Sequence, residues 1–513
     1  MTARALRLVM MAGLACAWAA PAAAGDFMDT RVTWTFGDDN LLADAGEQLP
    51  DSPLASIGDR QGYELFMDNL DSRYTGRENQ THLVMYKRLP GFFPRLSTEA
   101  GLVLRFDIDD SGIDMRDDGT YLRIRYGFDD VPEDEGGDGV ALVFFPWDTE
   151  RFRLGYLWDI SWGGGGIFTN KRNGFAPGLK LQFNIGAIDF YAGFKTAKIS
   201  EQRESDVEGE PLNVQETNYG GLAGIGGDIG RMFRIDASGG YFQQGTFDQP
   251  GLVGEPVYTF GGSIRFAVHD GIDVGPGADF RLYRNEPMAI DALAEEADAA
   301  AALADRAAAL ALPLPSELTW AVTLEGTVLG QHVADLDTVG GSVIQPAYAA
   351  ALQFKLKYGG FTTHLTAFFR NLEFILHNVP SFSPFVALPG AAETQPEFFV
   401  AAGLSYFFDG PRLTPALIAG VQLPATLQSG GTTIVVRDEE TRDILPSGDD
   451  SVPIFSTRVS LRWDLSDILS LYAMIQYVHD ENATSLSRDG SGTFRVYRRA
   501  DQLGLAVIAQ ARF

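Results

Sequence analysis

The chain is organised in segments of about ten residues in which apolar side chains occupy alternate positions, the length and pattern of barrel strands. Clear examples run from Leu102 to Ile108, from Leu122 to Phe128 and from Phe398 to Phe408. Side chains of a β-strand alternate between its two faces, so each segment predicts a strand with one apolar face. The same pattern continues at Phe152–Trp158, Leu179–Phe183, Phe190–Phe194, Tyr258–Phe266, Leu352–Tyr358 and Phe455–Trp463.

The first residues have the features of an export signal. Arg4 and Arg7 precede an uninterrupted apolar run from Leu8 to Ala20, and Ala22-Ala23-Ala24 offers a small-residue cleavage site. We expect residues 1–24 to be removed, together with Cys16, the only cysteine. The mature chain would then form no disulfide and no thiolate metal site.

Composition narrows the classes of partner. Removing Arg4 and Arg7 from the 40 basic residues leaves 38 against 68 acidic residues, a net charge of −30. A chain of this charge is not expected to bind nucleic acid. Its apolar content of 45% argues against disorder. The longest uncharged runs are broken by prolines and predict no membrane helix, so a membrane could be crossed only by a closed sheet.

The last predicted strand, Gln502–Phe513, is apolar at every second position. Gln502, Gly504, Val507, Ala509 and Phe513 resemble the C-terminal assembly signal of bacterial outer-membrane β-barrels. The resemblance implies residence in the bacterial outer membrane, contact with its lipid and lipopolysaccharide, and handling by the barrel-assembly machinery. Aromatic residues near strand boundaries fit an interfacial girdle; they are Trp158, Trp162, Trp320, Trp463, Tyr358 and Tyr406.

These observations predict an all-β fold, a single antiparallel transmembrane β-barrel of 16–18 strands over residues 61–513. Residues 25–60 are expected to form one N-terminal strand near Val32–Phe36 and an acidic, loop-like segment. Short and long connections should lie on opposite rims, but their alternation is lost between residues 284 and 346. There the alanine-rich segment 288–312 predicts a helical insertion, ended by Pro313 and Pro315. Short turns are expected at Gly186-Ala187, Asp228–Gly230, His269–Gly271, Gly359-Gly360, Asp409–Pro411 and Leu465–Asp467.

Basic residues recur between the apolar positions of the strands and should therefore face the lumen. Acidic residues at equivalent positions are fewer, and most acids fall in predicted loops. Such bases could attract anions, or they could pair with acids and fill the barrel; the sequence leaves both open. The predicted pore-lining residues are Arg105, Arg123, Arg125, Arg151, Arg153, Lys180, Lys195, Arg265, Arg281, Lys355, Lys357, Arg370, Arg458 and Arg462.

One acidic segment has the spacing of a calcium-binding loop. Asp107, Asp109 and Ser111 place oxygens at every second residue, Gly112 permits a turn, and Asp118 occupies the twelfth position. The flanking helices of an EF-hand are missing and Asp118 replaces the usual Glu. A solvated junction between strand and loop is the alternative, and no other cofactor is expected.

No catalytic motif is evident, because the six histidines are scattered and the sequence has no nucleophile elbow or phosphate loop. We therefore expect a non-enzymatic protein. The resemblance to porin-like barrels implies passive diffusion of small hydrophilic solutes, with a preference for anions. Two alternatives remain: a transporter or exporter of a larger acidic solute such as a polysaccharide, and a non-conducting barrel that displays acidic loops.

Overall fold

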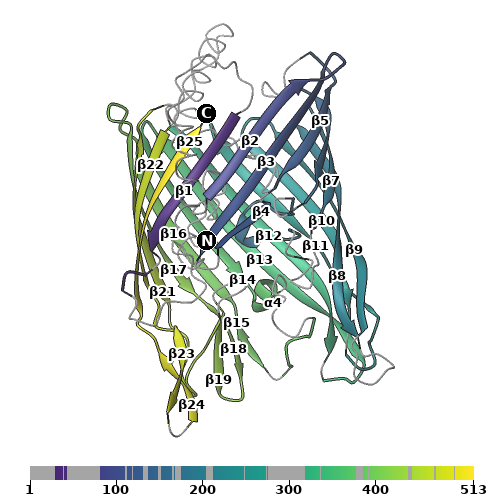
Figure 1. Ribbon diagram of the computed structural model, residues 1–513, viewed down its shortest axis with the longest axis vertical. Helices are drawn as coiled ribbons and strands as arrows, with labels where there is room; N and C mark the ends of the chain where they lie inside the picture. The colour runs from purple at the N-terminus through teal and green to yellow at the C-terminus, as the bar shows by residue number, and fades with distance from the viewer. Residues whose placement is uncertain are drawn as a thin grey trace.

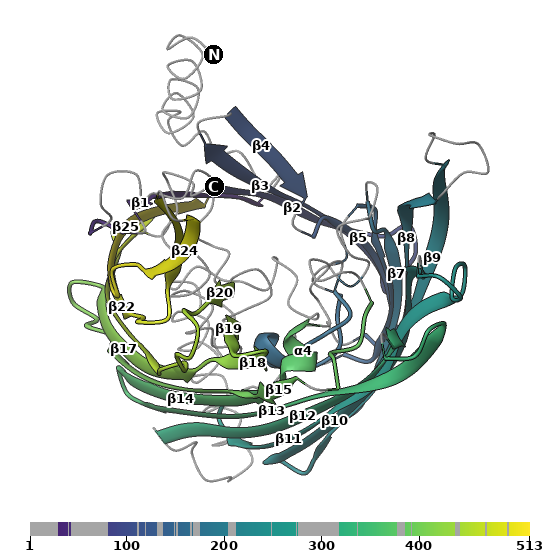
Figure 2. The ribbon, with the colours of Figure 1, turned by 90° about the horizontal axis from the view of Figure 1, so that it is seen from below.

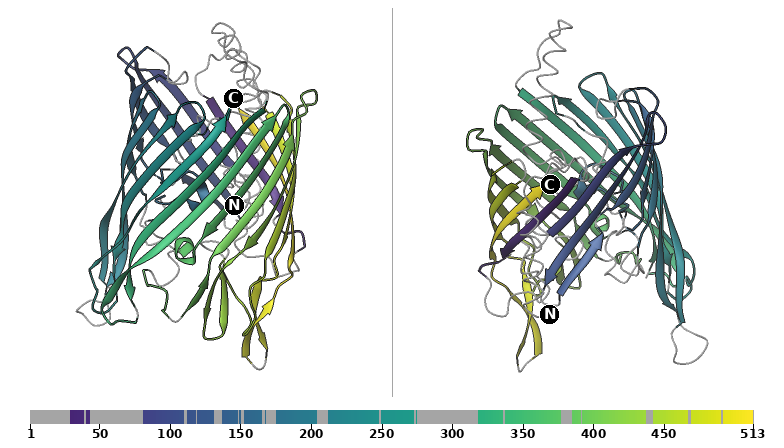
Figure 3. Two further views of the ribbon diagram at one scale, coloured as in Figure 1. Left: turned by 180° about the vertical axis from the view of Figure 1, so that it is seen from behind. Right: turned by 45° about the horizontal axis from the view of Figure 1, so that its top comes forward.

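The first and last strands of the chain are hydrogen-bonded to each other. In the computed structural model, β1 (Asp29–Asp38) and β25 (Asp501–Arg512) pair antiparallel, from Arg31 opposite Arg512 to Asp38 opposite Leu505. Figures 1 and 3 show that this pairing closes the sheet into a tilted barrel. The structure describes residues 29–38, 40–42, 81–109, 112–117, 119–130, 137–147, 149, 152–164, 167, 175–203, 212–247, 249–272, 274, 318–335, 337–376, 385–390, 392–436, 442–466, 469–489 and 492–512.

Every strand of the barrel wall pairs antiparallel with its neighbours. The strands after β1 and before β25 are β2 (Thr81–Pro90), β3 (Leu96–Asp109), β4 (Gly112–Asp117), β5 (Tyr121–Gly127), β6 (Gly139–Phe145), β7 (Gly178–Ile185), β8 (Ile188–Arg203), β9 (Leu212–Ile229), β10 (Phe233–Thr246), β11 (Pro256–Asp270), β12 (Leu318–Asp335), β13 (Gly341–Tyr358), β14 (Phe361–Arg370), β16 (Glu397–Tyr406), β17 (Leu413–Leu423), β21 (Ile454–Asp464) and β22 (Leu469–His479).

The described sheet contains 19 strands, but β4 and β5 are two halves of one barrel strand. The later part of β3 pairs with β4 and its earlier part with β5. Counting the two halves once gives an 18-strand barrel, within the predicted range. The predicted N-terminal strand is confirmed as β1, although it belongs to the barrel wall and not to a separate segment before residue 61.

The two faces of the wall have opposite character. In β5 the apolar Leu122 and Ile124 are 50% and 49% exposed, whereas Arg123 and Arg125 between them are 3% and 6% exposed. The exposed apolar face points outward, as the pattern predicted. Four of the predicted girdle residues, Trp320, Tyr358, Tyr406 and Trp463, lie on this face near one rim. A chain with this outer surface needs lipid around it, because so large an apolar area is unfavourable in water.

Because successive strands run in opposite directions, the connections between them fall alternately on the two rims of the barrel. The turns at Gly186-Ala187 and Gly359-Gly360 lie on one rim, here called the short-turn rim; the connections after β8, β10, β14, β17 and β22 lie on the other, the long-loop rim. The short turn expected at His269–Gly271 is wrong, because β11 ends at Asp270 and β12 begins only at Leu318. The connection between β11 and β12 is therefore a long one on the short-turn rim. It explains why short and long connections stop alternating between residues 284 and 346. The predicted helix at 288–312 and the segment 43–80 lie outside the described residues.

Smaller elements extend from the long-loop rim or fold inward from it. A four-stranded sheet of β15 (Glu393–Gln395), β18 (Ala425–Ser429), β19 (Thr432–Val436) and β20 (Arg442–Ile444) adjoins a hairpin of β23 (Thr484–Asp489) and β24 (Gly492–Tyr497). Figure 1 shows the hairpin and most of this sheet beyond the rim. The short helix α4 (Leu372–Leu376) lies within the barrel outline in Figure 2. None of the described helices is long and apolar enough to span a membrane.

The segment Phe152–Trp158 is not a barrel strand, and this prediction was wrong. It belongs to the connection between β6 and β7, residues 146–177, which contains the short 3-10 helix η3 (Trp158–Ile160). Phe152, Leu154 and Leu157 are fully buried. Trp162, predicted for the girdle, is buried in the same connection; the side chain of Trp158 lies outside the described part of the structure. We call the described residues of this connection (146–147, 149, 152–164, 167 and 175–177) the inward loop.

Candidate functional site

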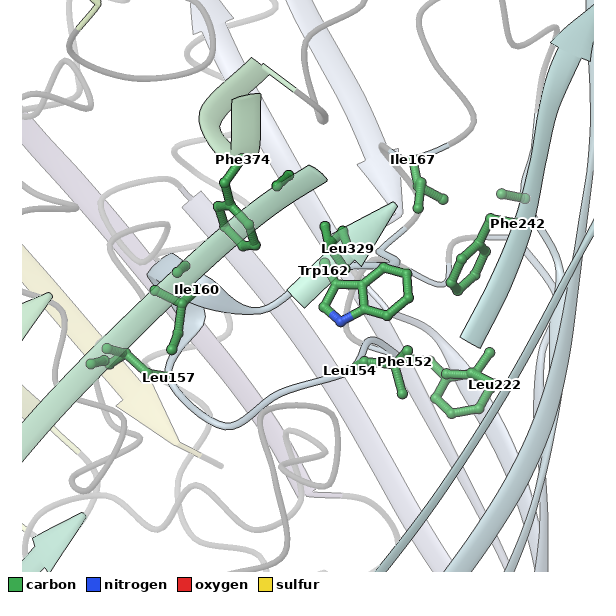
Figure 4. Close-up of a cluster of buried hydrophobic side chains, with 14 of the residues drawn as sticks. Phe152, Leu154, Leu157, Ile160, Trp162, Ile167, Leu222, Phe242, Leu329 and Phe374 are labelled. Carbon is green, nitrogen blue, oxygen red and sulfur yellow. The ribbon is translucent and has the colours of Figure 1, made fainter. Parts of the chain in front are cut away.

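The inward loop packs against the inner wall of the barrel. Its apolar residues form a buried cluster with inward side chains of several strands, and Figure 4 shows ten of these residues labelled. Trp162 meets Phe242 of β10 edge to face at 5.5 Å, and Phe152 stacks on Phe145 of β6 at 5.8 Å. Apolar burial on this scale stabilises the docked loop. The loop therefore occupies one side of the lumen in a fixed position.

A buried carboxylate fastens the backbone of the inward loop. Glu325 of β12 accepts hydrogen bonds from the backbone N–H of Tyr156 at 2.7 Å and of Leu157 at 2.8 Å. Gly155, just before them, has φ of +98°, and a Cβ there would lie 2.9 Å from Oε1 of Glu325. Consecutive N–H groups next to a left-handed residue form a concavity suited to an anion. Only glycine allows the carboxylate to approach the backbone this closely.

Further wall residues hold the rest of the loop. Lys195 of β8 donates from Nζ to the carbonyl oxygens of Thr149 and Gly163, at 2.8 and 2.6 Å. Thr327 of β12 donates to the carbonyl oxygen of Ile160, and Ser263 of β11 accepts from Nε1 of Trp162. These contacts give partners to buried backbone carbonyl groups and to the buried indole N–H of Trp162.

Five charged residues form a continuous row on the wall beneath the loop. Asp189 of β8, Asp236 of β10, Arg265 of β11 and Glu325 of β12 occupy the same level of the sheet, with Gly226 of β9 between the first two. Arg234 of β10 bridges the gap, because its Nη2 lies 2.6 Å from Asp189 and 3.0 Å from Asp236. Arg265 pairs with Asp236 and also stacks on the ring of Tyr156 at 3.9 Å. We call Asp189, Arg234, Asp236, Arg265 and Glu325 the charge row.

Several predicted pore-lining bases hold the loop or pair with acids. Lys195 binds loop carbonyls, Arg265 belongs to the charge row, and Arg153 lies in the loop and donates to the carbonyl oxygen of Ser161. Lys180 of β7 lies 5.4 Å from the ring centroid of Phe152. Arg370 of β14 pairs with the buried Glu397 at 2.6 Å and donates to the carbonyl oxygen of Asp159. For these residues, the interpretation that bases fill the barrel fits better than an open anion path.

Other predicted bases lie on the inward face of β13, β21 and β5. Lys355 and Lys357 of β13 and Arg458 and Arg462 of β21 are buried or half-buried. Arg462 pairs with Asp464 at 2.8 Å. Arg123 lies 3.7 Å from Glu99. Arg125 donates to the carbonyl oxygen of Gly137, on the short-turn rim.

The remaining predicted residues lie beyond what the structure describes. Arg151 and Arg281 fall in undescribed segments, as do Ser111, Asp118 and Phe513. Arg105 belongs to β3, but its side chain is outside the described part. Gln502, Gly504, Val507 and Ala509 of the assembly signal lie on β25, which closes the barrel.

The candidate calcium loop falls on the end of β3 and on β4. Asp107 pairs with Asp114 and Asp109 with Gly112 in the β3–β4 ladder, so the backbone on both sides of residues 110–111 is paired strand. Among the described residues no group of three or more His, Cys, Asp or Glu is placed to hold a metal. The side chains of the four candidate ligands lie outside the described part, so the calcium site stays a prediction.

Sequence reasoning missed the inward loop and the role of Glu325 as its anchor. The alternation of Phe152, Leu154 and Tyr156 is the same as in a barrel strand, so periodicity could not separate them. One signal was present: the run Gly163–Gly166 interrupts the pattern only one residue after Trp162. Gly163 has φ of +78°, and a Cβ there would collide with the ring of Phe242.

Comparisons with known proteins find only remote structural similarity. No protein-family model and no curated protein matches the chain. Among solved structures, OpdL of Pseudomonas aeruginosa has 11% identity over 95% of this chain and 97% of its own, with a TM-score of 0.41. The anion-selective porin of Comamonas acidovorans has 11% identity, coverages of 95% and 97%, and a TM-score of 0.34. OmpT of Vibrio cholerae has 8% identity, coverages of 95% and 96%, and a TM-score of 0.34.

At such scores the fold assignment rests on the chain's own geometry. A closed antiparallel barrel with an even strand number, an apolar outer face and a polar inner face is the architecture of a bacterial outer-membrane protein.

Proposed function

We propose that this protein is an outer-membrane diffusion channel for small hydrophilic solutes, with a lumen narrowed by the inward loop. The observation that carries the proposal is a loop fixed inside a closed barrel by Glu325, Lys195 and Arg370, three wall residues on different strands. A loop held at one side of the lumen restricts the size of solute that can pass. Passage is set by pore diameter and by the charges that line it.

A preference for anions rests on inward bases of β13 and β21. Lys357 is half-buried on this face, whereas Lys355 and Arg458 are buried. Positive groups in a water-filled lumen with low-dielectric walls raise the local concentration of anions. Many other bases are paired with acids, so we expect a moderate preference and not strict selectivity.

Planar-bilayer recording tests this function. The purified full chain should give stable single-channel currents, and a salt gradient should give a reversal potential that favours chloride over potassium. Cation preference would overturn the anion assignment but leave the channel intact. Lack of conductance in correctly folded protein would overturn the channel itself.

A non-conducting display barrel is the second candidate, and the buried apolar cluster of the lumen favours it. Trp162, Phe242, Phe374 and Phe399 are all at most 2% exposed inside the barrel, so part of the interior is packed as tightly as a soluble core. The same crowding disfavours an exporter of bulky polysaccharide. Liposome swelling with sugars of increasing size distinguishes the three, because a display barrel admits none, a narrow channel only small sugars, and an exporter large ones.

A further inference from the structure

The charge row connects wall residues near the short-turn rim to Glu325, the residue that holds the inward loop. Glu325 and Arg265 are opposite each other in the ladder between β11 and β12, and both contact Tyr156: one through its backbone N–H, the other through its ring. Arg265 is held in turn by Asp236, to which both Nε and Nη2 donate. Tyr156 is therefore clamped from two sides by neighbouring members of the row.

The row continues to the short-turn rim. Asp236 also accepts from Nε of Arg234, whose other nitrogens reach Asp189 at 2.6 Å and Asp228 at 3.3 Å. Charges of alternating sign in contact fix each other's orientation, and burial makes each contact stronger and the loss of one partner costlier. Side chains of Arg234 and Arg265 are 5% and 2% exposed. Displacing one member should therefore disturb the next.

Gly226 is the position that allows the row to cross β9. A Cβ at this residue would collide with the carboxylate of Asp236 and lie 2.9 Å from Nη2 of Arg234. Gly221 on the same strand has nothing within 4 Å of such a Cβ. The chain thus offers two glycine-to-alanine changes of equal chemistry, of which only one disturbs the charge row.

We propose that the charge row is a single positioning device that sets the place of the inward loop and hence the aperture of the lumen. Asp189 and Arg234 act in it as positioning residues at a distance, through Asp236 and Arg265. The consequence for the aperture rests on the proposed channel function; the coupling between row and loop does not.

The labelling rate of a cysteine on the inward loop measures the coupling between the charge row and the loop without an electrical recording. In full-length protein carrying Cys16→Ser, the change Ser161→Cys places the only thiol on the loop, at a residue 2% exposed. A membrane-impermeant maleimide should label it slowly. Adding Gly226→Ala should raise the labelling rate by roughly 2- to 30-fold, the range that 0.5–2 kcal/mol of coupling corresponds to. Adding Gly221→Ala should leave the rate unchanged.

Heat-modifiable gel migration shows whether each variant is a folded barrel. If Gly226→Ala does not fold, Arg234→Gln replaces it, and Arg234→Lys should restore protection in part because it keeps the charge. Unchanged labelling in folded Gly226→Ala and Arg234→Gln protein overturns the proposal. An equal increase with Gly221→Ala also overturns it, because the effect would then be general loosening of β9. Faster labelling together with no current in any variant would retain the positioning device and reject the channel.

Discussion

Lys195 donates from its Nζ to the carbonyl oxygen of Gly163 over 2.6 Å, and so joins the barrel wall to the middle of the inward loop. The same ammonium group lies 5.3 Å from the ring centroid of Phe152 and donates to Thr149. A residue that the sequence suggested for the pore lining is thus completely buried beneath the loop. Its charge stabilises backbone carbonyls and does not face the solute path.

Replacing Lys195 with methionine tests this role. The substitution keeps most of the side-chain length but removes the lysine donor from the carbonyl oxygen of Gly163, at a cost of about 1–3 kcal/mol. The carbonyl oxygen of Thr149 keeps the N–H of Phe152 as a donor. We expect the unfolding midpoint in urea to fall and the inward loop to become sensitive to protease. Lys198→Met, at an exposed position of the same strand, is the matched control. Equal stability of the two variants would contradict the anchoring role.

The barrel itself could be predicted because its strands obey a simple rule. Lipid outside and polar groups inside require strict alternation, as in Leu122, Arg123, Ile124 and Arg125. The same rule misled at Phe152–Trp158, because a loop packed between a wall and a lumen also alternates. Contacts between residues such as Tyr156 and Glu325, 169 positions apart, leave no periodic trace in the sequence. The division of inward bases into loop anchors and lumen residues therefore required the structure.

Because the apolar face of the wall points outward to lipid, a charged side chain placed on that face should destabilise the barrel strongly. Val459 lies near the middle of β21 and is 54% exposed on the apolar side. Val459→Arg should make folding into lipid vesicles less favourable by about 2–4 kcal/mol, the cost of arginine near the bilayer midplane. Leu486→Arg, on the hairpin beyond the long-loop rim, should change it by less than about 0.5 kcal/mol. Guanidinium titrations in vesicles measure both, and similar values would show that Val459 does not face lipid.

The hairpin β23–β24 should show a high tyrosine pKa. Partial burial of Tyr497 and its 2.7 Å hydrogen bond to Asp449 raise the pKa of this phenol from 10 to about 12. The folded hairpin keeps the proton between these values while the unfolded chain loses it, so its stability should fall as pH rises from 10 to 12. The difference in ultraviolet titration between the native protein and Tyr497→Phe measures the pKa. Asp449→Asn should lower it toward 10; no change would contradict the role of the hydrogen bond.

Inward bases of β13 and β21 should determine ion selectivity. Lys357 of β13 is half-buried on the inward face and lies level with Ser460 of β21, two residues from Arg458 on the same face. A unit charge about 7 Å from a permeating ion in water contributes about 0.6 kcal/mol, a factor of about 3 in local anion concentration. Lys357→Gln and Arg458→Gln should therefore each reduce the chloride-to-potassium permeability ratio by up to about threefold. Salt at 1 M should mask the difference, because screening then acts within about 3 Å.

Arg498→Gln is the control for selectivity, because Arg498 lies just beyond β24 on the long-loop side and is exposed. Its loss removes the same charge from the protein without changing the inner wall. We expect its reversal potential to match that of the native channel within the scatter of single-channel recordings. If Arg498→Gln shifts the potential as much as Arg458→Gln, the selectivity arises from the overall charge of the outer rim and not from the lumen. If neither inner variant shifts it, Lys357 and Arg458 lie away from the solute path, and the anion preference must come from other residues.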